Sequence, residues 1–131
     1  MKRVALLVLG YLWAAPFSAI GAVAWLATYV LEWHRVRRVR ERAIETVLTG
    51  PFAAFMLRPR DDGWRWEGIT LGVFVFYYGP PTPERERHER RHVVQNMALG
   101  PIAMLLHLWS VVSYRTNPLE RDATRAEADQ R

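Results

Sequence analysis

The feature that most constrains this chain is an uninterrupted apolar run near its N-terminus. The 28 residues from Val4 to Leu31 include no Asp, Glu, Lys, Arg or His. As a helix they would extend for about 42 Å, which exceeds the roughly 30 Å hydrocarbon core of a bilayer. The apolar region of a signal peptide is only about 7 to 15 residues long, so this run is interpreted as a retained transmembrane anchor within residues 1–34. Pro16 predicts a bend in a single helix, and a hairpin of two short helices is the alternative.

Basic residues flank the anchor unequally. Lys2 and Arg3 precede it, whereas five arginines follow it within Arg35–Arg42. The positive-inside rule therefore predicts location in the inner (cytoplasmic) membrane, with the C-terminal side facing the cytoplasm. Residues 35–60 are basic and contain an amphipathic stretch from Ala43 to Leu57. We expect this segment to lie on the membrane surface or against the anchor, with arginine side chains among the lipid head groups.

Composition excludes several classes of protein and site. The chain has no cysteine, so it has neither a disulfide framework nor a thiolate metal site, and a metal would need His, Asp or Glu ligands. Its net charge of +5 is concentrated in residues 1–60. No zinc-finger, homeodomain or aromatic-sheet signature accompanies that charge, so membrane lipids, and not nucleic acid, are the expected partner. A length of 131 residues leaves room for one catalytic unit, which we assign to residues 61–131. Nothing in the sequence selects an oligomeric state.

The first part of this unit has the composition of short strands. Asp61-Asp62-Gly63 is a turn signal, and the residues after it are rich in aromatic and β-branched side chains. We expect two strands, about Trp64 to Glu67 and Ile69 to Tyr78. The predicted fold class is therefore mainly α with a small β-hairpin, attached to the N-terminal transmembrane anchor.

The rest of the unit predicts helices with clear start and stop signals. Thr82 and Asn117 are each followed by proline, which is typical of an N-cap and the first helical position. Gly100 followed by proline is a helix break. The predicted helices are Pro83 to about Leu99, Ile102 to Tyr114, and Pro118 to about Asp129.

The first of these helices contains the H-E-x-x-H sequence from His88 to His92. Residues four apart share a helix face, so both imidazoles can reach one Zn²⁺. Glu89 is then placed beside the metal, where it could accept a proton from a water that the metal acidifies. Such a site needs a third protein ligand, for which Glu120 is the best candidate. The alternative is that Pro83 to His92 is simply a solvated charged helix.

The run HERRHVVQ, followed by LGP and then NPLERDA, resembles a group of small bacterial membrane-associated metallopeptidases of the zincin type. In that group an H-E-x-x-H-x-x-Q helix precedes a Gly-Pro break and an Asn-Pro-x-Glu-x-x-Ala segment. The resemblance covers roughly Ile69 to Asp129 and implies a minimal zincin-like α+β unit. It further implies that His88, His92 and Glu120 bind Zn²⁺, as in gluzincins, and that Glu89 is the general base.

The resemblance also implies how substrate is aligned. A strand ahead of the active helix, within Ile69–Tyr78, would add the substrate as a further strand. The chain departs from the group at Arg90 and Arg91, where a small or apolar residue is often found between the histidines. This departure bears on substrate access and not on metal binding.

Several nearby residues admit two interpretations. Glu120 could instead pair with Asn117 in a capping box, and Glu127 on the same helix face would then be the reserve ligand. Gln95 is either a partner of His92 or a bridge between helices. His107 lies in an apolar helix and is interpreted as a core or interface histidine more readily than as a ligand. Three tyrosines could polarise a substrate carbonyl: Tyr77, Tyr78 and Tyr114.

One geometric requirement follows for the apolar stretch from Val93 to Tyr114. His92 precedes it and Glu120 follows it, so it must turn at Gly100 and return to the same side of the membrane. The predicted function is a membrane-anchored, zinc-dependent metallopeptidase acting on a peptide or protein substrate. The alternatives are a non-catalytic membrane adaptor or structural zinc-binding protein, and a peripheral lipid-binding protein acting through Arg35–Arg42.

Overall fold

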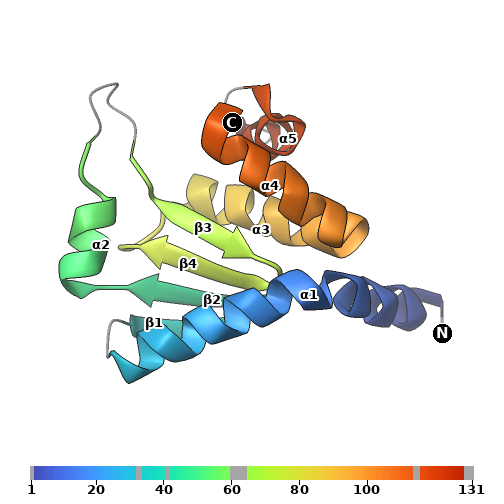
Figure 1. Cartoon of the computed structure of the whole chain (residues 1–131), viewed down its shortest axis with the longest axis horizontal. Coiled ribbons are helices and arrows are strands. Elements are labelled where there is room, and N and C mark those ends of the chain that lie inside the picture. The colour runs from blue at the N-terminus through green and yellow to red at the C-terminus, as the bar shows by residue number, and fades with distance from the viewer. Residues whose placement is uncertain (1, 32–33, 41, 60–64, 114–115, 129–131) are drawn as a thin grey trace.

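The computed structural model describes residues 2–31, 34–40, 42–59, 65–113 and 116–128. Over these ranges the chain is mostly helical, with five helices and one small sheet (Figure 1). The helices are α1 (Lys2–Val30), α2 (Gly50–Met56), α3 (Pro83–Leu99), α4 (Pro101–Ser113) and α5 (Pro118–Ala128). The strands are β1 (His34–Arg40), β2 (Ala43–Leu48), β3 (Gly68–Leu71) and β4 (Phe74–Tyr78).

The N-terminal apolar run forms one helix and not a hairpin. α1 continues through Pro16, and its ribbon changes direction along its length in Figure 1. By length and composition α1 could cross a membrane. Its second half also packs on the sheet, because Gly21 lets the helix approach Phe74 closely and the Ser18 hydroxyl accepts a hydrogen bond from the Val73 amide at 3.2 Å. The helix is thus part of the folded unit as well as a candidate anchor.

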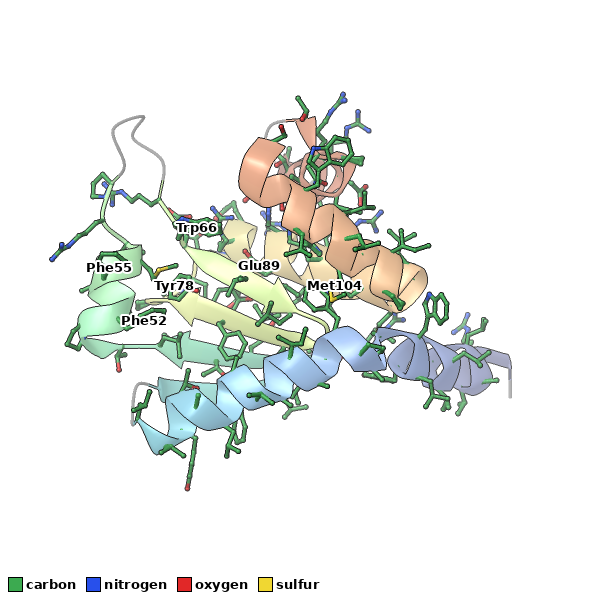
Figure 2. All side chains as sticks on the ribbon, in the orientation of Figure 1. Phe52, Phe55, Trp66, Tyr78, Glu89 and Met104 are labelled. Atoms are coloured by element: carbon green, nitrogen blue, oxygen red, sulfur yellow. The ribbon has the colours of Figure 1, made fainter. Side chains whose placement is uncertain are left out.

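The sheet has four strands in the order β1-β2-β4-β3. β1 and β2 form an antiparallel hairpin, β3 and β4 form another, and β2 joins the two by pairing in parallel with β4. The basic segment at residues 35–60, expected on the membrane surface or against the anchor, supplies two strands and α2 in its described part. Phe52 of α2 contacts Tyr78, with ring centroids 5.9 Å apart, so α2 also packs on this sheet (Figure 2).

The hairpin predicted after residue 63 forms at a different place. We expected one strand to end at Glu67 and the next to run from Ile69 to Tyr78, but the turn lies inside the second range, at Gly72 and Val73. Gly72 has φ +66° and lies directly against Ser18, so a side chain there would be strained and would collide with α1. The turn signal at 61–63 and Trp64 lie outside the described residues.

The three predicted C-terminal helices are present with their predicted caps. The Thr82 hydroxyl accepts a hydrogen bond from the Arg85 amide at 3.3 Å, and Pro83 is the first residue of α3. Gly100, with φ +54°, separates α3 from α4 as a sharp turn. The Asn117 carboxamide accepts a hydrogen bond from the Leu119 amide at 2.8 Å at the start of α5. Tyr114 and Asp129, at the predicted ends, lie outside the described residues.

Candidate metal centre

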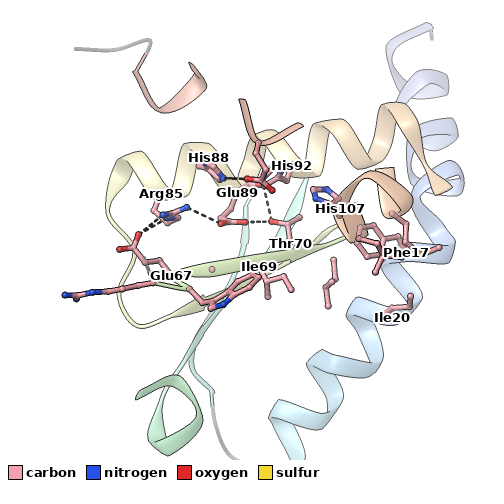
Figure 3. Close-up of a pocket in the computed structure, with 17 residues that line it drawn as sticks. Phe17, Ile20, Glu67, Ile69, Thr70, Arg85, His88, Glu89, His92 and His107 are labelled. Carbon is pink, nitrogen blue, oxygen red and sulfur yellow. Dashed lines mark hydrogen bonds and ion pairs between the residues drawn. The ribbon is translucent and has the colours of Figure 1, made fainter. Parts of the chain in front are cut away.

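Three buried side chains from two helices meet between α3 and α5. His88 and His92 lie one turn apart on α3, and Glu120 lies in the first turn of α5. Their relative exposures are 2%, 4% and 6%. The two histidine Nε2 atoms are 3.1 Å apart, and Glu120 Oε2 lies 3.4 Å from that of His88 and 3.5 Å from that of His92 (Figure 3). These residues could hold a metal ion.

The partner of His92 Nδ1 shows which nitrogen of this imidazole carries a proton. Gln95 donates its amide to the Leu119 carbonyl at 3.1 Å and to Asp122 at 2.7 Å, which leaves its carbonyl oxygen 2.8 Å from His92 Nδ1. That oxygen can only accept, so His92 Nδ1 carries a proton, and when the imidazole is neutral its lone pair is on Nε2. Glu127 Oε1 faces His88 Nδ1 at 3.4 Å.

The donor set fits a tetrahedral cation. When both imidazoles are neutral, two nitrogen lone pairs and a carboxylate oxygen point into the same space. A cation in that space would stabilise this arrangement. Four ligands at about 2.0 to 2.1 Å from Zn²⁺ lie about 3.3 to 3.4 Å from one another. The observed separations of 3.1 to 3.5 Å match that spacing closely. Two nitrogens and one carboxylate oxygen are also the usual protein ligands of a catalytic zinc.

Electrostatics in the cluster follow from the same contacts. Burial acts to raise the pKa of Glu120, but the adjacent His88 and His92 imidazoles outweigh it and hold this pKa well below its ordinary range. Burial acts to lower the pKa of His92, but the Glu120 and Glu89 carboxylates outweigh it and raise this pKa above its ordinary value. Glu120 is therefore a carboxylate in the folded protein, as a metal ligand must be.

The structure separates the two interpretations of Glu120. Its carboxylate faces the histidines, while Asn117 caps α5 with its own side chain and donates to the Leu106 carbonyl at 2.5 Å. Glu127 lies on the other side of His88, so it contacts the nitrogen that would not bind metal. Gln95 contacts His92 and also bridges α3 to α5, which combines both of its interpretations.

Glu89 is buried beside this cluster without belonging to it. Its Oε2 accepts a hydrogen bond from the Thr70 hydroxyl of β3 at 2.7 Å, and its Oε1 lies 3.8 Å from Arg85 Nη1. Gly68 leaves room for this carboxylate, because a Cβ there would be 2.9 Å from Oε1. Burial acts to lower the pKa of Arg85, but its hydrogen bonds with Glu67 raise it overall. Sequence reasoning missed Thr70 and Arg85, although the four-residue spacing of Arg85 and Glu89 was a usable signal.

The two arginines inside the motif do not enter the site. Arg90 Nε lies 2.7 Å from Glu45 of β2, and its Nη2 lies 2.9 Å from Glu86. Arg91 makes two hydrogen bonds to Asp122 of α5, at 2.6 and 3.1 Å. Neither arginine lines the cavity next to the cluster.

A cavity of about 350 Å³ opens onto the cluster. Its walls come from α1, the segment leading into β3, β3 itself, α3, α4 and Glu120 of α5. His107 of α4 is one of the lining residues, with its ring centroid 4.8 Å from that of His92, so it is closer to the site than its interpretation as a core histidine implied. Burial lowers the pKa of His107 to about 4, so it is neutral at pH 7. Tyr77 and Tyr78 do not line this cavity, and Tyr114 lies outside the described residues.

No protein-family model, curated protein sequence or solved structure matches the chain.

Proposed function

We propose that the protein is a membrane-anchored, zinc-dependent metallopeptidase of the zincin type, with His88, His92 and Glu120 as the zinc ligands. One observation carries the proposal: three metal-binding atoms converge at the wall of a cavity, and a second buried carboxylate, that of Glu89, lies beside them without belonging to the set. A structural zinc site is usually closed by four protein ligands, whereas a catalytic site keeps one position open. Three protein ligands next to a cavity correspond to the second case.

The chain's own residues have separable roles in this mechanism. Zinc, when bound, supplies the Lewis acidity that activates water and polarises a carbonyl. Glu89 accepts the proton of the attacking water and delivers it to the leaving amine. Thr70 holds one oxygen of Glu89 by its hydrogen bond and leaves the other to exchange the proton. Arg85 forms an ion pair with the other oxygen of Glu89, at 3.8 Å, and so helps to position this carboxylate.

The edge of the sheet supports a peptide as the substrate. β3 has β4 on one side, and the order of the described strands places it at the end of the sheet. Residues 65–71 line the cavity along that edge. An extended peptide could pair with β3 and bring a carbonyl to the metal. Of the two described strands in the predicted range Ile69–Tyr78, β3 has a free edge, whereas β4 is enclosed between β2 and β3.

The membrane assignment rests on α1 and on the charges that follow it. α1 has the length and composition of a span, and the arginines of Arg35–Arg42 outnumber the basic residues before it. By the positive-inside rule the active site then faces the cytoplasm.

The test of the proposed function is Glu89→Gln in the full-length protein. The amide keeps the size of the side chain but cannot accept a proton, so zinc content should stay near one per chain while hydrolysis of a peptide library falls by about 10² to 10⁴. If the wild-type protein binds zinc but cleaves nothing, including itself, the metal is structural and the proposal is wrong.

A further inference from the structure

The cavity has two chemically different ends. Charged side chains gather at one end, where Arg65, Glu67 and Arg85 line it. The other end is formed by apolar side chains of α1 and α4: Phe17, Ile20, Met104 and Leu108. Figure 3 shows Glu67 and Arg85 on one side of the metal cluster and Phe17 and Ile20 on the other. A substrate that occupies both ends must therefore have a polar part and an apolar part.

The apolar end is open to the outside. Ile20 and Leu108 both line the cavity, yet they remain 50% and 61% exposed, so they form its rim. This rim continues into the exposed apolar surfaces of its two helices. On α1 that surface includes Leu12, Val23 and Leu26, and on α4 it includes Ile102, Leu105 and Trp109. The mouth between α1 and α4 therefore opens onto the surface that the proposed anchor would present to lipid.

We propose that the substrate is an apolar segment of a membrane-embedded polypeptide, which enters the cavity from the bilayer between α1 and α4. The inference rests on the proposed function, because it names the substrate class of the same site. Among the described residues, the rim and the apolar end carry no Asp, Glu, Lys or Arg side chain, and His107, which packs against Phe17, is the polar group there. A charged segment would therefore lose its hydration there without compensation, whereas an uncharged apolar segment would not.

The neighbouring strand supports this substrate. A segment must be extended to be cleaved, and in a bilayer an extended backbone has unpaired N–H and C=O groups that are costly to bury. β3 lies along the cavity at the edge of the sheet and can pair with those groups. The cavity thus offers both an apolar entrance and a hydrogen-bonding partner for an unwound segment.

The experiment measures binding without turnover. Full-length Glu89→Gln protein is reconstituted into phosphatidylcholine–phosphatidylglycerol vesicles together with an apolar, membrane-inserted synthetic peptide that carries a central benzophenone. A water-soluble peptide of Ser, Lys and Glu with the same label is the comparison probe. Photo-crosslinking should be strong for the membrane-inserted peptide and weak for the soluble one. Equal crosslinking of both peptides would overturn the inference.

Matched variants identify the entrance. Ile20→Gln and Leu108→Gln change the rim, while Val23→Gln and Leu105→Gln change exposed residues of the same helices that do not line the cavity. The rim variants should lower crosslinking about tenfold, the value of one buried apolar side chain, and the control variants should leave it unchanged. Equal effects in both pairs would overturn the inference. Ile20→Ala and Leu108→Ala provide a second test should the glutamine variants lose zinc.

The outcome is separable from that of the proposed function. Crosslinking with rim specificity but no hydrolysis by the wild-type protein would contradict the metallopeptidase and leave the apolar binding site in place. Hydrolysis of soluble peptides at a rate that the rim variants do not change would support the metallopeptidase and contradict the entry of an apolar substrate between α1 and α4.

Discussion

Replacing Gln95 by leucine is expected to weaken zinc binding although Gln95 is not a ligand. The substitution keeps the approximate volume of the side chain but removes the oxygen that lies 2.8 Å from His92 Nδ1. In the metal-free protein His92 can respond by moving its proton to Nε2, which faces Glu120. In the zinc-bound protein it cannot, because Nε2 must supply the lone pair, so an unsatisfied Nδ1–H stays buried. The substitution therefore destabilises the zinc-bound protein more than the metal-free protein.

The size of the effect follows from that unsatisfied donor. A buried N–H without an acceptor costs about 1 to 3 kcal/mol, which corresponds to about a 5- to 150-fold loss of affinity. Removing a residue that orients a zinc-binding histidine typically costs about 10- to 100-fold, which agrees. We expect Gln95→Leu to weaken zinc binding within this range while the metal stoichiometry stays at one.

The assay is competition with a chromophoric chelator, using the detergent-solubilised full-length protein. Asp122→Asn is the matched control, because asparagine can still accept the hydrogen bond from Gln95 and the substitution weakens only a half-exposed pair with Arg91. It should bind zinc with near wild-type affinity. If Gln95→Leu also binds normally, or if both variants lose affinity equally, His92 is not oriented by Gln95 and the assignment of its tautomer is wrong.

Three further predictions test the ligands, the topology and the packing of α1. Glu120→Ala should remove zinc, measured as metal content after dialysis. Glu127→Ala removes a group beside His88 and not a ligand, so it should weaken zinc binding less. The reverse order would mean that the third ligand is misassigned. Reporters fused after Arg131 and inserted at Gly100 should both behave as cytoplasmic, and opposite sides would mean that the stretch from Val93 to Tyr114 spans the membrane and that the site cannot form. Gly21→Val should lower stability to thermal unfolding by about 1 to 3 kcal/mol, because Phe74 lies 2.9 Å from a Cβ there, while Ala19→Val, on an exposed position of the same helix, should not; equal stabilities would mean that α1 does not pack on the sheet as described.

The helices of the site were predictable because their signals are local. Thr82 with Pro83, Gly100 with Pro101, and Asn117 with Pro118 each act within one turn of the backbone, and all three mark a boundary in the structure. The spacing of His88 and His92 is also a local property of a helix. Glu120 was predictable only as a candidate, because its contact with the histidines depends on how α5 packs against α3.

The sheet was harder to predict because its pairing is not local. β2 pairs in parallel with β4, and the register joins Ile44 to Phe74 across about 30 residues of intervening chain. The segment before it, β1, has four arginines among its seven residues, and this basic composition favoured a location at lipid head groups over a strand. The same non-local packing brings α1 and α4 together at the cavity, and no motif in the sequence indicates that cavity.

The two arginines between the histidines, Arg90 and Arg91, form ion pairs with neighbouring elements of the fold. Glu45 is 3% exposed on β2, where an unpaired carboxylate would be costly, and Arg90 compensates it from 45 residues away. Arg91, the next residue of α3, forms an ion pair with Asp122 of α5. The two variable positions of the motif therefore tie α3 to the sheet on one side and to the helix of Glu120 on the other. Arg90 neutralises a buried carboxylate and so contributes to holding α3 on the sheet, whereas the half-exposed pair of Arg91 and Asp122 contributes little to the position of the ligands.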